Sequence, residues 1–164
     1  MMATWSSTGE GVGAIDLDAL YRSQHLAMTR LAHAIVGSNP VAEEIVHDAF
    51  VRLGRARPER VDEPVAYLRT IVVNLSRSWI RRQVVGRRVH EQVGARAAAP
   101  AIEPVVDETW AALQRLPMKY RAVLALRYYE DLPDEQIADV LGCRRATVRS
   151  LVHRGLELLR KELT

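Results

Sequence analysis

The amino-acid sequence predicts an all-α protein in which two small helical domains are joined by a flexible linker. Apolar residues recur at spacings of three and four along most of the chain, which is the period of an amphipathic helix, and no segment alternates as a half-buried strand does. A stretch rich in Ala, Gly and Pro interrupts this pattern. Hydrophobic residues make up 48% of the 164 positions, which is enough to fill a core.

The periodicity divides the chain into four parts. Residues 1–16 are polar and contain closely spaced glycines, which predicts a mobile N-terminal tail. Residues 17–83 form the first predicted domain, and residues 108–164 form the second. Between them, residues 84–107 lose the helical pattern, which predicts a linker that contains at most a short helical segment.

The first domain begins with two predicted helices. From Leu17 onward, apolar residues recur three and four positions apart, and the run Gly37–Pro40 ends the first helix. The second helix is expected from about Pro40 to Leu53, with its apolar residues on one stripe. A polar loop, Gly54–Asp62, follows and carries several arginines.

A third helix is expected after this loop. Asp62 and Glu63 precede Pro64. Acidic side chains interact favourably with the positive N-terminal end of a helix. Proline is favoured at the first position, because the N–H that it lacks would find no acceptor within the helix. Apolar residues then recur on one side of the helix, which is expected to end at Arg81 and Arg82.

The segment Asp134–His153 has the spacing of a helix-turn-helix. Ile137 is placed in the buried face of the first helix, and Ala138 is small where the second helix must cross closely. Gly142 stands where the chain leaves the first helix in a left-handed conformation, which favours glycine. Val148 then turns the second helix inward. This unit normally inserts its second helix into the DNA major groove.

The second helix of this unit is predicted to have one apolar and one polar side. At about 100° per residue the apolar side chains gather together, and the opposite side offers donors for guanine edges and phosphates. The residues on that polar side are Ala146, Arg149, Ser150, His153 and Arg154. An ordinary helical hairpin with a solvated basic face is the alternative interpretation.

Composition narrows the classes of function. The net charge of +3 favours an anionic partner, although codon usage equally explains the predominance of Arg over Lys. Cys143 is the single cysteine, so no internal disulfide or cysteine-rich zinc site is expected, and it is either a redox switch or a buried turn residue. No histidine pair has metal-ligand spacing, so no catalytic, metal or cofactor site is expected. Without a signal peptide or an apolar span, a cytoplasmic protein is expected.

Three segments carry a resemblance to a known family. The segment Leu116–Leu132, which runs directly into the helix-turn-helix, resembles region 4 of the extracytoplasmic-function (ECF, group IV) sigma factors of bacterial RNA polymerase. The segment Ala42–Phe50 is similar to the polymerase-docking helix of their region 2. The segment Ala66–Leu75, followed by Trp79, is similar to the region 2 helix that contacts the promoter. Within the family, the chain resembles the actinobacterial SigE-like branch.

The resemblance implies a transcription initiation factor and not an enzyme. It implies that region 2 binds the β′ clamp of core RNA polymerase and opens the −10 element of promoter DNA. Region 4 would bind the β flap and read the −35 element as duplex. It also implies an anti-sigma factor as a partner, no membrane association, no cofactor, and a monomer when free.

Residue by residue, the resemblance implies three sets of contacts. The polymerase-docking residues are Glu44, Asp48 and Phe50. The −10 DNA-binding residues are Arg55, Arg57 and Arg60 in the polar loop, and Asn74, Arg77, Trp79, Arg81 and Arg82 on the third helix. The −35 DNA-binding residues are Arg145, Thr147, Arg149, Ser150, His153 and Arg154. Trp79 either stacks on an unpaired base or packs in the core.

Other interpretations remain open. A stand-alone helix-turn-helix transcriptional regulator explains residues 108–163, but it leaves the acidic second helix and the region around Asn74 without a function. A peptide-binding adaptor would explain the second domain alone, and salt-dependent DNA binding would exclude it. Pro133 stands where family members often carry a Ser cap, so either Asp134 caps this helix or Pro133 starts it. Gly155 replaces a frequent Ala and is expected to soften the recognition helix.

Overall fold

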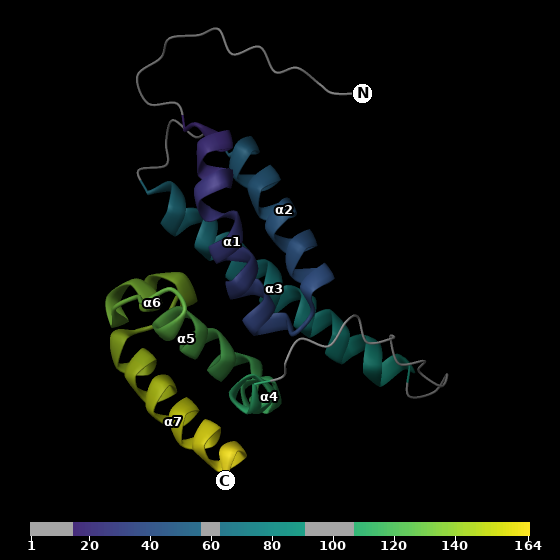
Figure 1. The fold of residues 1–164 in the computed structure, drawn as a ribbon, viewed down its shortest axis with the longest axis vertical. Coiled ribbons are helices and arrows are strands. Elements are labelled where there is room, and N and C mark those ends of the chain that lie inside the picture. The colour runs from purple at the N-terminus through teal and green to yellow at the C-terminus, as the bar shows by residue number, and fades with distance from the viewer. Residues whose placement is uncertain (1–14, 57–62, 91–106) are drawn as a thin grey trace, which may run out of the picture.

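The computed structural model describes residues 15–56, 63–90 and 107–164, and these residues form an all-α fold without strands (Figure 1). The predicted fold class is confirmed. The expected tail up to residue 14 and most of the expected linker lie outside the described residues. The helices are α1 (Leu17–Val36), α2 (Asn39–Arg55), α3 (Pro64–His90), α4 (Glu108–Arg115), α5 (Met118–Tyr128), α6 (Asp134–Leu141) and α7 (Arg145–Leu163).

The N-terminal block, residues 15–90, consists of α1, α2 and α3, and each of these helices contacts the other two (Figure 1). Asp16 caps α1, because its carboxylate accepts hydrogen bonds from the backbone N–H groups of Asp18 and Ala19 at 3.1 Å. At the other end Gly37 has φ of 78°, a left-handed conformation that ends α1. Pro64 begins α3 as predicted.

The end of α3 differs from the prediction. The helix continues to His90, so the expected end at Arg81 and Arg82 is wrong. Neither arginine stops a helix, and Gly86 alone costs only about 1 kcal/mol relative to Ala, which does not end one either. The first seven residues of the expected linker, 84–90, therefore belong to α3.

The C-terminal block, residues 107–164, packs α4, α5 and α6 around α7. The predicted helix-turn-helix is α6 followed by α7. Gly142 has φ of 64°, and the next N–H, that of Cys143, donates to the carbonyl oxygen of Ala138 at 3.0 Å, which closes the turn. Ile137 and Val148 are fully buried, as the spacing predicts.

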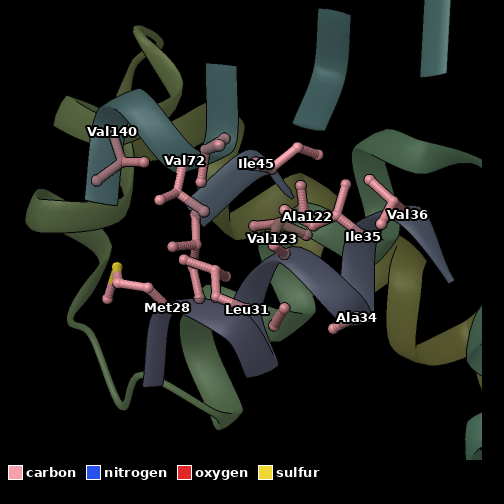
Figure 2. Packing of buried hydrophobic residues seen from close by; sticks show 14 of the residues in the cluster. Met28, Leu31, Ala34, Ile35, Val36, Ile45, Val72, Ala122, Val123 and Val140 are labelled. Carbon is pink, nitrogen blue, oxygen red and sulfur yellow. The ribbon is translucent and has the colours of Figure 1, made fainter. Parts of the chain in front are cut away.

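The two blocks share one hydrophobic core. Figure 2 shows Leu31 and Ile35 of α1 beside Ala122 and Val123 of α5, all of them buried. Helix α1 contacts α5, and α3 contacts α6. Periodicity assigned each apolar stripe to its own domain and left this contact between the blocks unpredicted.

Polar groups also join the blocks. Gln114 of α4 donates from Nε2 to the carbonyl oxygen of Ala34 in α1 at 2.9 Å. Arg69 of α3 pairs through Nε with Glu130, which follows α5, at 2.9 Å, and both side chains are nearly buried. No helix in these described ranges is long and apolar enough to cross a membrane.

Acidification is expected to weaken the fold at a contact between the blocks. The His33 ring of α1 stacks on Trp110 of α4 with 4.4 Å between centroids, and burial lowers the pKa of His33 from its usual 6.5. The unfolded chain therefore binds more protons, so this contribution to stability is present above about pH 6.5 and is lost as the pH falls through the folded pKa. Urea unfolding between about pH 7.5 and about pH 5 should show a steeper loss of stability in the wild-type chain than in His33→Phe. Equal slopes would contradict this prediction.

Candidate nucleic-acid and polymerase interfaces

The recognition helix α7 presents one polar face to solvent. Val148 and Gly155 are buried on its inner side, where Gly155 lies against Leu124 of α5. Close packing of the two helices is therefore the structural reason for a glycine at this position. The predicted −35 residues are all exposed: Arg145, Thr147, Arg149, Ser150, His153 and Arg154.

Asp134 ties this face to the rest of the helix-turn-helix. It is the first residue of α6, so the helix starts there and Pro133 precedes it. No side chain caps this end of α6. The Asp134 carboxylate instead accepts from Nε of Arg149 at 3.1 Å and pairs through its other oxygen with Arg127 of α5. The capping role considered for Asp134 is therefore wrong, because two guanidinium groups hold its carboxylate.

The predicted −10 residues on α3 differ in their exposure. Asn74, Arg81 and Arg82 are exposed, whereas Arg77 is half-buried. Burial lowers the pKa of Arg77, and the positive charge of Arg81 one turn away lowers it further. Arg55, which the sequence placed in the polar loop, is instead the last residue of α2 and is exposed. Arg57 and Arg60 lie outside the described residues.

Trp79 lies where the two blocks meet. Its ring is half-buried and packs against the core. It also lines a cavity of about 470 Å³ between α3 and the α4–α5 corner, together with Gln114, Met118 and Arg121. The indole therefore makes packing contacts between the two blocks. Burial lowers the pKa of Arg121, which donates to the backbone and side-chain oxygens of Gln114.

Helix α2 carries the predicted docking residues on two different sides. Glu44 is exposed, and Asp48 is half-exposed with its carboxylate 3.3 Å from Nε of Arg52. Phe50 is only 9% exposed and packs edge-on against Tyr21 of α1, with 5.0 Å between ring centroids. Helix α2 therefore offers the carboxylates of Glu44 and Asp48 to solvent, whereas Phe50 supports the helix from the core.

Sequence reasoning missed two acidic partners. Asp134 is 15 residues from Arg149, and Glu130 is 61 residues from Arg69. From a sequence, side-chain pairs can be predicted only between residues three or four positions apart on one helix. Neither pair therefore left a local signal, and the fold alone brings the partners together. In the part of the chain that the structure describes, no group of three or more His, Cys, Asp or Glu side chains is placed to hold a metal ion.

Both blocks match known families. Residues 20–84 match Sigma-70 region 2, and residues 107–159 match Sigma-70, region 4. The fold is similar to that of the sigma factor RpoE from Bartonella quintana, solved in complex with the anti-sigma factor NepR. That comparison has a TM-score of 0.71 at 23% identity and covers 89% of this chain and 97% of that one.

Two relatives are similar over almost the whole chain. The ECF RNA polymerase sigma factor SigE of Mycolicibacterium smegmatis is 30% identical, with 98% of this chain and 66% of the relative covered. The RNA polymerase sigma-E factor of Streptomyces coelicolor is 29% identical, with 91% of this chain and 86% of the relative covered. The region 2 match covers helices α1–α3 and the region 4 match covers helices α4–α7. The chain therefore belongs to the sigma-70 family of RNA polymerase sigma factors, in its extracytoplasmic-function group.

Proposed function

We propose that this chain directs core RNA polymerase to a set of promoters in the bacterial cytoplasm, as a specificity subunit without catalytic activity of its own. The observation that carries the proposal is the polar face of α7, where all six predicted −35 residues are exposed to solvent while Val148 anchors the helix from within. Region 4 uses this face on the −35 duplex and binds the β flap. Region 2 binds the β′ clamp and opens the −10 element.

The −10 function has a structural consequence. Arg77 and Trp79, two residues proposed to line the melted strand, are half-buried. Trp79 lies against the α4–α5 corner, which belongs to the C-terminal block. We propose that the two blocks move apart when the melted strand reaches Trp79. An anti-sigma factor, such as the one bound to the RpoE neighbour, is the partner we propose for the chain when it is not bound to polymerase.

In vitro transcription tests the proposed function. Purified bacterial core polymerase is incubated with and without the chain on a pool of upstream genomic fragments. Defined new start sites that share an upstream pair of elements are expected. Sequence-specific DNA binding without start sites and without co-elution with core polymerase would instead identify a stand-alone helix-turn-helix regulator.

Replacing Arg149 with Ala is expected to weaken −35 binding. A guanidinium that contacts a base edge contributes about 1–3 kcal/mol of preference for the correct base. Competition between the identified −35 element and a scrambled one measures this preference. Arg160→Ala is the matched control, since it removes the same charge from an exposed position in the last turn of α7. An unchanged preference in Arg149→Ala would exclude the base-reading role.

Replacing Asp48 with Arg is expected to impair binding to core polymerase. The change replaces a carboxylate of α2 with a positive charge beside Arg52, which pairs with Asp48 in the wild-type chain. Like charges at this spacing repel, and the carboxylate is no longer available to a positively charged partner surface. Co-elution with core polymerase gives the readout. Asp18→Arg is the control, because Asp18 is an exposed acid of α1 that pairs with Arg22 four residues later. Normal holoenzyme formation by Asp48→Arg would reject the assignment of α2 as the docking helix.

A further inference from the structure

We infer that Asp134 is a positioning residue for promoter readout, which holds the guanidinium of Arg149 in the orientation that meets the −35 element. The inference rests on the proposed function, because it assumes that Arg149 contacts a base. It adds a residue on α6, outside the recognition helix, that decides how well α7 discriminates between sequences.

The contact leaves the recognition end of Arg149 free. Asp134 accepts from Nε of Arg149 at 3.1 Å, whereas the two terminal amino groups carry the remaining donors of the guanidinium. Those donors form the bidentate contact to O6 and N7 of guanine. The side chain of Arg149 is 67% exposed and that of Asp134 only 17%, so the ion pair leaves most of the Arg149 side chain open to solvent.

The charges around Asp134 make this arrangement compatible with DNA. A lone carboxylate beside the groove would repel the phosphates. Here Arg127 pairs with one carboxylate oxygen and Arg149 with the other, so the three groups together carry one positive charge. An unbound arginine loses rotamer freedom when it contacts a base. An arginine that an ion pair already orients loses less, which favours the correct base over a scrambled site.

A merely structural role predicts a different result. The Arg127–Asp134–Arg149 cluster joins α5, α6 and α7, so its removal could loosen the whole helix-turn-helix. Loosening would lower the melting temperature and weaken binding to every sequence. Loss of positioning lowers discrimination between sequences and acts only through Arg149, so it disappears when Arg149 is absent.

The experiment is a double-mutant cycle on the full chain assembled with core polymerase. Asp134→Asn keeps the shape of the side chain and removes its charge, and it is combined with Arg149→Ala. Affinities are measured on the promoter found by transcription and on the same fragment with a scrambled −35 element. Asp139→Asn is the matched control, because Asp139 is an exposed acid on the same helix and the change of charge is identical.

Asp134→Asn is expected to lower the discrimination ratio about 10-fold, as is usual for coupled neighbours. The melting temperature of Asp134→Asn should stay close to that of the wild type. The discrimination ratio of the control Asp139→Asn should also be unchanged. In the Arg149→Ala background, Asp134→Asn should change the ratio no further. If Arg149→Ala lowers the ratio and Asp134→Asn does not, the inference is wrong while the proposed function stands. An equal loss with and without Arg149 would also overturn it, and an unchanged ratio in Arg149→Ala would refute the proposed role of Arg149 itself.

Discussion

Replacing Glu130 with Gln is expected to lower the free energy of unfolding by about 3–5 kcal/mol, because it leaves a buried guanidinium without its counter-charge. The Glu130 carboxylate lies 2.9 Å from Nε of Arg69, and the two side chains are 8% and 11% exposed. The pair joins α3 of the N-terminal block to the turn after α5 in the C-terminal block. Urea unfolding of the full chain measures the effect.

Two controls separate burial from charge. Asp18→Asn breaks the exposed pair with Arg22 and should cost no more than about 1 kcal/mol. The double variant Arg69→Met with Glu130→Leu removes both charges and should be close to neutral, since apolar residues of similar size often replace a buried pair without loss. A cost as small as that of Asp18→Asn for Glu130→Gln would mean that water reaches this pair in solution, and that the two blocks are not held together there.

Replacing Ile137 with Ala is expected to destabilise the chain by about 2–5 kcal/mol, through lost burial and the cavity left behind. Ile137 is fully buried on α6. The same variant should weaken −35 binding, because α6 packs against the recognition helix α7 and fixes its position. Urea unfolding and −35 affinity, measured on the same preparation, check both effects.

Truncations of graded size provide the comparison for Ile137. Ile137→Val removes one methyl group and should cost about 0.5–1.5 kcal/mol. Leu26→Ala removes an apolar side chain that is 61% exposed on α1, so it should have little effect on stability. Similar costs for Ile137→Ala and Leu26→Ala would contradict the assignment of Ile137 to the core.

Several parts of the molecule were predictable because their signals are local. The start of α3 at Pro64, the left-handed turn at Gly142 and the buried position of Val148 all depend on residues within one or two helical turns. The exposed face of α7 follows from the same periodicity. The end of α3 was not predictable in this way, because no glycine or proline stops the helix at Arg82 and its continuation to His90 has no local marker.

The fold class, the helix-turn-helix and the exposed polar face of α7 were thus contained in the sequence, since neighbouring residues set helix period, caps and turns. The burial of Phe50, the position of Trp79 between the blocks and the pairing of Arg69 with Glu130 were decided only by the tertiary structure. An apolar stripe shows that a helix face is buried but not what covers it. Here one core serves both blocks, so partners 61 residues apart meet although no spacing in the sequence relates them.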